Sequence, residues 1–343
     1  MSTTLNSGID PASFSAVTGP AQDLFRYVNG PWIDMYRLPD DRSRYGSFDK
    51  LAEDAENQIR EILEDDDCPA EKSHALYASF LDVDAINASG LAAIEDQLKA
   101  IDVAADKAEL TRSLGAMNPA GGPDLIGIAV YGDPGAPATN IIHIEQSEAY
   151  YREDHYAPIR EAYVDMVAKQ LKNAKLAADD EQAEAQAQRF LDVETRIAAN
   201  HWDNVATRDS VKTYNPTDYA ELSGMLADYD LDTWIESWQS AYDQTSAAQV
   251  QPLDFRGIFN HVVVHEPSFL TGLNAFWKAA DLDDLKLWAR VHVIIGSPLE
   301  LPHEFDETNF EFYGKTLSGQ KQQRVRWKRG VSLVNGICGE DVG

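Results

Sequence analysis

The sequence predicts a mainly α-helical protein with one β-hairpin, followed by the beginning of a smaller α/β region. Three observations support this fold class. Apolar residues recur at three- and four-residue steps through most of the 343-residue chain, as on the buried face of helices. Two apolar runs, residues 125–131 and 140–145, flank a turn rich in Gly and Pro, which is typical of a hairpin. A β-branched run at residues 262–264 predicts a short buried strand.

Composition narrows the possible partners and the compartment. The chain has 57 acidic and 29 basic residues and a formal net charge of −28, which disfavours nucleic acid and anionic membrane surfaces as partners. Only two cysteines are present, Cys68 and Cys338, so no disulfide framework is implied. No signal peptide or membrane-spanning run is visible in the sequence, and we expect a cytoplasmic protein.

The N-terminal region divides into an arm and an aromatic segment. Residues 1–22 are small and polar and predict an arm. Residues 23–49 combine six aromatic residues, four arginines and two Pro-marked turns, so neither a plain amphipathic helix nor an alternating strand is expected there. We interpret this stretch as a compact aromatic anchor that leads into a helix over residues 49–64.

The remaining elements follow from periodicity and breakers. Thr213-Tyr214-Asn215-Pro216 predicts a turn, a loop is expected between residue 294 and Asn309, and Leu317-Ser318-Gly319 predicts another turn. The final apolar segment, Val331 to Cys338, is expected to be exposed as an apolar surface, because its packing partners would lie beyond residue 343. The predicted helices cover residues 71–117 in several pieces, 158–171, 183–197, two shorter segments up to 247, 268–280 and 282–294.

Several short motifs, taken in order, resemble the neprilysin and endothelin-converting-enzyme family of zinc metalloendopeptidases. They are Asp23-x-Phe25-x-Tyr27-x-Asn29-Gly30-x-Trp32, Arg44-Tyr45-Gly46-Ser47-Phe48-Asp49, residues 140–146, Tyr150-Tyr151, residues 213–215, Val262-Val263-Val264 with Pro267, Phe310-x-Phe312-Tyr313-Gly314 with residues 317–319, and residues 326–329. The resemblance covers nearly the whole chain. One departure is that Gln146-Ser147 passes directly to residues 148–151, without the family's Gly-Leu-Gly-Leu-Pro segment.

The resemblance implies a domain organisation. Residues 23–258 would form a helical substrate-recognition lobe, and residues 259–343 would begin a thermolysin-like α/β catalytic lobe, with a peptide-sized cavity between the lobes. The family's zinc helix (HExxH), its glutamate ligand and its late catalytic histidine lie beyond residue 343. Zinc is therefore implied for the complete enzyme, and no catalytic residue is expected in this chain.

Within the chain, the histidine patterns do not predict a metal site. His265 and His303 are each followed by glutamate, but Phe269 and Glu307 stand where a second zinc ligand would be. His261 and His265 lie on a predicted strand, which would separate their rings by roughly 13 Å. The other histidines, including His143, are interpreted as core or capping groups.

Arg44 and Asp49 are the predicted substrate-binding residues. In the family that the motif resembles, the matching arginine binds the free C-terminal carboxylate of short peptides and the matching aspartate positions it. A guanidinium can hold a carboxylate through two parallel hydrogen bonds. The alternative is a purely structural Arg44–Asp49 pair, and Arg42 is a nearby competitor. For the basic stretch 321–329, a solvated loop or pairing with acidic neighbours is favoured over nucleic-acid binding.

The sequence thus leads to one favoured function and two alternatives. The favoured reading is the N-terminal, substrate-recognition part of a peptide-hydrolysing zinc metallopeptidase, inactive as this chain alone and completed by a C-terminal catalytic lobe. The first alternative is a non-catalytic peptide-binding module, either a degenerate or a split family member. The second is a purely structural helical protein.

Overall fold

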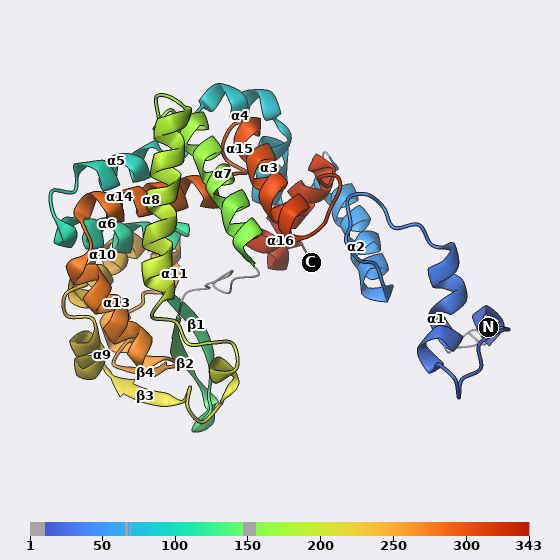
Figure 1. Ribbon diagram of the computed structural model, residues 1–343, viewed down its shortest axis with the longest axis horizontal. Coiled ribbons are helices and arrows are strands. Elements are labelled where there is room, and N and C mark those ends of the chain that lie inside the picture. The colour runs from blue at the N-terminus through green and yellow to red at the C-terminus, as the bar shows by residue number, and fades with distance from the viewer. Residues whose placement is uncertain (1–10, 66–67, 69, 147–155, 343) are drawn as a thin grey trace.

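The computed structural model describes residues 11–65, 68, 70–146 and 156–342. Helices make up most of the molecule, and a small sheet lies at one end of the main helical body (Figure 1). The helix α2 (Ser47–Leu63) packs beside α16 (Arg326–Val342), while α1 (Leu24–Met35) stands apart from the body. The predicted mainly α fold class is therefore confirmed.

The other described helices are η1 (Pro11–Ser13), α3 (Glu71–Leu81), α4 (Val83–Ser89), α5 (Glu95–Val103), α6 (Lys107–Met117), η2 (Asn118–Ala120), α7 (Ala157–Asn173), α8 (Asp180–Ala198), η4 (Ala206–Arg208), α9 (Tyr219–Met225), α10 (Leu231–Asp243), α11 (Ser246–Val250), α12 (Phe255–Ile258), α13 (Pro267–Ala279), α14 (Leu282–Gly296), α15 (His303–Asn309) and the π-helix η5 (Phe310–Leu317). The described strands are β1 (Ile126–Asp133), β2 (Ala136–Gln146), β3 (Asn215–Asp218) and β4 (His261–Val264).

The described strands form one mixed sheet with the order β1-β2-β4-β3. The predicted hairpin is β1 and β2, which pair antiparallel, whereas β4 runs parallel to β2. The turn of the hairpin is shorter than predicted, because the Asp133 carboxylate accepts hydrogen bonds from the Gly135 amide (2.8 Å) and the Tyr214 hydroxyl (2.9 Å). A Cβ atom at Gly135 would lie 2.2 Å from that hydroxyl oxygen, so the position requires glycine.

Strand β3 replaces the turn that the sequence predicts at residues 213–216. It pairs antiparallel with β4, with Pro216 opposite Val263. Proline lacks an amide donor but is tolerated on an edge strand, and β3 is the edge of this sheet. The side-chain amide of Asn215 also donates to the carbonyl of Val264 (2.9 Å), so contacts from a distant strand decide the conformation.

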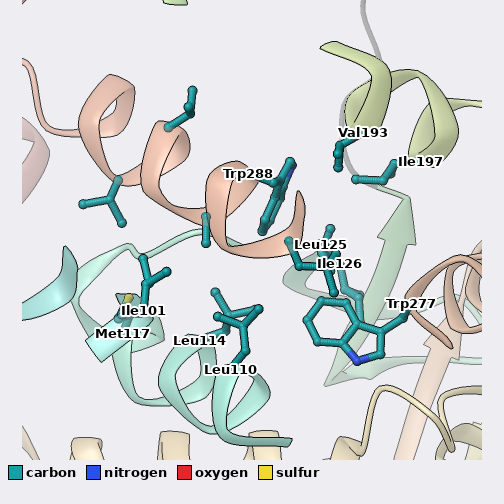
Figure 2. Close-up of a cluster of buried hydrophobic side chains, with 14 of the residues drawn as sticks. Ile101, Leu110, Leu114, Met117, Leu125, Ile126, Val193, Ile197, Trp277 and Trp288 are labelled. Carbon is teal, nitrogen blue, oxygen red and sulfur yellow. The ribbon is translucent and has the colours of Figure 1, made fainter. Parts of the chain in front are cut away.

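One large hydrophobic cluster, here called the main core, joins the sheet to the helices. Its buried members run from Ile94 to Phe312. Figure 2 shows part of it, where Leu110 and Leu114 of α6, Leu125 and Ile126 at the start of β1, and Trp277 of α13 converge. Residues on both sides of position 258 contribute, and β4 pairs with β2 and β3. The described core therefore continues across residue 258, where the sequence analysis places a domain boundary.

A second, smaller cluster lies where α2, α3 and α16 meet. This small core consists of Leu63, Tyr77, Val331 and Val334. Both valines are fully buried, so the expectation that Val331 to Cys338 leaves an apolar surface is wrong at these two positions. Ile337, in contrast, is 65% exposed.

A buried ion pair connects the two cores. Asp306 of α15 accepts two hydrogen bonds from Arg329 of α16, at 2.6 and 2.9 Å, and a third from Gln323 at 2.9 Å. The side chains of Asp306 and Arg329 are only 8% and 16% exposed. The helix α16 is thereby fixed to the main body through charge as well as through apolar contact.

The prediction of a non-helical aromatic anchor is wrong, because residues 24–35 form α1 despite Pro31. Asp23 caps the helix by accepting from the Arg26 amide at 2.9 Å. Pro31 cannot donate to the carbonyl of Tyr27, and that carbonyl instead accepts from the Ser15 amide at 2.7 Å. The segment is also not a buried nucleus, since Phe25 and Phe48 are 64% and 86% exposed.

The predicted loop between residue 294 and Asn309 contains the helix α15, and η5 follows directly after it. Tertiary contacts stabilise these helices: Gln170 of α7 donates to the Phe305 carbonyl (2.9 Å) and to the Asn309 side chain (2.7 Å). Phe305 and Phe312 are both buried in the main core. The turn after Leu317 is confirmed, and Gly319 has a φ of +68°. Within the described residues, no helix is both long and apolar enough to cross a membrane.

Candidate functional site

The predicted substrate-binding residues lie where the segment after α1 enters α2. Three stacked aromatic rings hold this segment: the centroid of Tyr36 lies 4.6 Å from that of Trp32 and 4.7 Å from that of Tyr45, and the latter two are 6.3 Å apart. Asp49 lies in the first turn of α2, where a carboxylate is favoured by the helix dipole. The local structure therefore places residues 42–49 next to the N-terminus of a helix.

Arg42, and not Arg44, pairs with Asp49. The guanidinium of Arg42 donates to Asp49 at 3.3 Å and to Glu53 at 3.0 Å. Its side chain is 13% exposed, against 26% and 27% for the two carboxylates. The structure thus does not bring Arg44 and Asp49 together in an ion pair, and the structural Arg44–Asp49 alternative is absent from the described residues.

Arg44 is exposed and makes no hydrogen bond or ion pair with any part of the chain that the structure describes. Its guanidinium therefore has all its donors available to a ligand. The neighbouring Arg42 is committed to two carboxylates of α2. The substrate-binding role of Arg44 and Asp49 stays a prediction.

Glu53 is the centre of the charge network beneath Arg44. It accepts from Arg42 and from the Tyr45 hydroxyl (2.8 Å), and Lys328 lies 3.8 Å away. Partial burial opposes ionisation of Glu53, but the Tyr45 hydrogen bond and the two cations outweigh it and lower its pKa. The same hydrogen bond is the main reason that the pKa of Tyr45 rises to about 12.

The basic stretch 321–329 pairs with acidic residues of this region, as predicted. Lys321 lies 2.9 Å from Asp40, and Arg324 pairs with Glu56. The amides of Lys321 and Gln322 also donate to the carbonyl of Asp40. Arg324, Lys328 and Arg329 thus have intramolecular carboxylate partners, which leaves the stretch poorly suited to nucleic acid.

A second cluster of chemistry-bearing residues lies on the sheet and was missed by the sequence reasoning. One ligand atom each from His143, Glu145 and His265 lies within 4.8 Å of the others. Burial lowers the pKa of His265; the charge of Glu145 opposes this shift and His143 adds to it. His261 does not belong to the cluster. The sequence does show His143 and Glu145 two residues apart on one strand face, but only the parallel pairing of β2 with β4 brings His265 to them.

Comparison with known proteins identifies relatives along nearly the whole chain. A sequence model of peptidase family M13 matches residues 20–343. Human neprilysin is 24% identical over 367 residues, covering 96% of this chain and 47% of neprilysin. Mouse membrane metallo-endopeptidase-like 1 is 26% identical, covering 94% of this chain and 45% of that protein.

Solved structures agree with the sequence comparisons. The Mycobacterium tuberculosis zinc metalloprotease Zmp1, solved in complex with an inhibitor, superposes with a TM-score of 0.85 at 32% identity. The match covers 98% of this chain and 51% of Zmp1. PepO from Lactobacillus rhamnosis shares the fold, with a TM-score of 0.76 at 16% identity. The chain therefore spans about half the length of the proteins that it resembles. The Tyr150-Tyr151 motif and the shortened segment after Gln146 lie outside the described residues.

Proposed function

Because this chain belongs to peptidase family M13, we propose that it is the substrate-recognition part of a zinc metallopeptidase that hydrolyses short peptides. The observation that carries the proposal is the family match over residues 20–343, together with the similarity to neprilysin and to the zinc metalloprotease Zmp1. The chemistry itself would be carried out by a catalytic lobe outside these 343 residues.

The residues present do not fit the family's zinc site. No HExxH pattern occurs in the sequence: His265-Glu266 is followed by Pro267-Ser268-Phe269, and His303-Glu304 by Phe305-Asp306-Glu307. In an HExxH motif both histidines lie on one helix. The helix α13 begins only at Pro267, so His265 lies before it. We therefore derive no catalytic step through zinc for this chain and predict that it does not cleave peptides by itself.

Arg44 is proposed to bind the C-terminal carboxylate of the peptide. Its exposed guanidinium has no partner among the described residues, whereas Arg42 is held by Asp49 and Glu53. Asp49 would act through Arg42, since their ion pair fixes the segment that carries Arg44 to the start of α2. A bidentate, charge-assisted contact between a guanidinium and a carboxylate contributes about 1.5–3 kcal/mol.

The test uses the complete enzyme and pairs of peptides that differ only in a free or an amidated C-terminus. We expect Arg44→Ala to raise KM for the free-carboxylate peptides by about 10- to 150-fold, the factor that corresponds to 1.5–3 kcal/mol. The amidated peptides should be unaffected. Lys50→Ala is the matched control, because Lys50 is also an exposed cation near the start of α2. Equal losses on both kinds of peptide would refute the carboxylate-binding role.

The prediction that this chain binds peptides but does not cleave them by itself is tested separately. The 343-residue chain should show no chelator-sensitive peptide cleavage, and the reading frame that encodes it should continue into a segment with HExxH. Chelator-sensitive cleavage by the chain alone would refute the prediction that it is inactive. A reading frame without such a segment would instead favour a non-catalytic peptide-binding module, in which case Arg44→Ala would still weaken peptide binding.

A further inference from the structure

Two imidazoles and one carboxylate meet on the outer face of the sheet. His143 and Glu145 lie two residues apart on β2, so both side chains project from the same face. The β4 register pairs His143 with Val263 and Ile144 with Val264, and the His265 amide donates to the Ile144 carbonyl at 2.8 Å. This register places His265 beside Glu145. The opposite face of the same strands carries Ile142, Ile144, Val262 and Val264 into the main core.

One ligand atom from each of the three side chains lies within 4.8 Å of the others, and His265 faces its two neighbours through different ring nitrogens. Nδ1 of His143 lies 2.8 Å from Nε2 of His265, and Nδ1 of His265 lies 3.6 Å from an oxygen of Glu145. Tetrahedral zinc with bonds of about 2.0–2.1 Å separates its ligand atoms by roughly 3.3 Å. For His143 Nδ1 and His265 Nε2 to bind one such ion, the ion would replace the proton that they share, the two nitrogens would move apart by about 0.5 Å, and Glu145 would turn from His265 Nδ1 toward the ion.

We propose that His143, Glu145 and His265 bind one divalent transition-metal ion of the zinc class. Two histidines and one carboxylate are an established ligand set for zinc, and solvent completes the coordination. The site is accessible from that side, because the side chains of Glu145 and His265 are 37% and 23% exposed. Imidazole ligands favour zinc, copper or nickel over magnesium and calcium, which prefer oxygen.

The surroundings of the cluster favour a cation. His143 is 4% exposed, and the ring nitrogen that faces the cluster is its Nδ1 atom. A second carboxylate, that of Glu266, is 3% exposed and accepts from the Gln146 amide at 2.9 Å. The charge of Glu145 is unfavourable for this buried acid. A bound divalent ion would neutralise Glu145 and relieve the repulsion between the two carboxylates.

The rigid location of these residues makes the site more than a surface cluster. The backbones of His143 and Glu145 are fixed by the strand pairing, and His265 directly follows β4 and is held by the hydrogen bond from its amide to the Ile144 carbonyl. The ring of Tyr131 packs edge-on against His143 with centroids 5.2 Å apart. Sites supported by regular strands hold their ligands more precisely than sites on loops. The ligands are also 120 residues apart in sequence, so the ion would tie β2 to β4.

Metal binding is tested with the untagged 343-residue chain, which contains no HExxH, so the result is independent of the proposed peptidase function. After dialysis against EDTA, the chain is titrated with Zn²⁺ by calorimetry and with Co²⁺ by visible absorption. We expect one ion per chain and an increase in thermal stability with zinc. His265→Asn and Glu145→Gln should each weaken binding by more than the roughly 10- to 100-fold that the loss of an outer-shell partner costs.

His261→Asn is the matched control, because His261 is an exposed histidine at the start of β4, the strand that His265 directly follows, and lies outside the cluster. It should bind zinc with unchanged affinity. Circular dichroism establishes that the variants fold, and both test variants alter partly exposed side chains. Failure of the folded parent chain to retain one ion, or unchanged binding in His265→Asn, would overturn the proposal. Unchanged binding in Glu145→Gln would overturn the assignment of Glu145 as a ligand.

Discussion

The main core and the region around the small core are stabilised in different ways. The main core buries apolar side chains from Ile94 to Phe312. The small core buries only four apolar residues. The segment that approaches it, residues 40–56, is attached to residues 321–328 by ion pairs of Asp40 with Lys321, Glu53 with Lys328, and Glu56 with Arg324.

Because of this difference, we expect the two regions to differ in mobility. Burial of apolar surface contributes about 25 cal/mol per Å², whereas a solvent-exposed ion pair such as Asp40–Lys321 contributes only about 0–1 kcal/mol. Parts of a protein with few buried apolar contacts open locally while the rest stays folded. We therefore expect the segment carrying Arg44 to be adaptable and the sheet carrying His143 and His265 to be rigid. A peptide site benefits from the first property and a metal site from the second.

The largest expected change in the free energy of unfolding comes from a substitution in the main core. Trp277 is fully buried, its ring packs edge-on against Tyr229 at 4.9 Å, and it lies among the side chains of Figure 2. Trp277→Ala should lower the free energy of unfolding by about 3–5 kcal/mol, measured by urea denaturation. Val250→Ala, at an 87% exposed position, should change it by less than about 0.5 kcal/mol. A Trp277 loss below about 1 kcal/mol would contradict the dominance of the main core.

The second prediction is that the two regions respond to pH in opposite directions. Asp124, just before β1, accepts from Asn118 and the Ile126 amide, yet burial outweighs these hydrogen bonds and raises its pKa to about 7. Because the folded-state pKa is raised, the contribution of Asp124 is present below its ordinary value of about 3.9 and is lost as pH rises through 7. Glu53 has a lowered pKa, so its contribution is present at neutral pH and is lost as pH falls below the ordinary glutamate range.

Hydrogen exchange, corrected for intrinsic rates, separates these two responses. Between pH 5 and pH 8 the protection of β1 should decrease, and Asp124→Asn should abolish the decrease. Below about pH 4 the protection of α2 should decrease while that of β1 is retained, and Glu53→Gln should remove this acid response. Parallel loss of protection in both elements would mean that the two regions unfold as one unit.

The sequence predicts those parts of the protein that depend on local pattern. The helical stripes, the hairpin and the intramolecular pairing of the basic stretch are confirmed, because apolar spacing and charge complementarity are local or compositional properties. The helix α1 was not predicted. Pro31 leaves the Tyr27 carbonyl without its helical donor, and the Ser15 amide that donates to it instead belongs to no sequence motif that includes Tyr27. The strand β3 pairs with β4 across 43 to 49 residues, and the His143–His265 contact spans 122 residues. Neither can be predicted from a local pattern.

The smallest expected effect concerns two arginines that are neighbours in sequence and differ in their contacts. Arg42→Ala removes the ion pairs to Asp49 and Glu53, and we expect α2 to lose about 1 kcal/mol of local stability. Arg44→Ala removes an exposed side chain that has no partner among the described residues, so stability should stay within about 0.5 kcal/mol of the parent. Protection of α2 amides against hydrogen exchange measures both. Equal destabilisation by the two substitutions would show that Arg44 is engaged in holding the fold, and a residue engaged in this way would not be free to bind a peptide carboxylate.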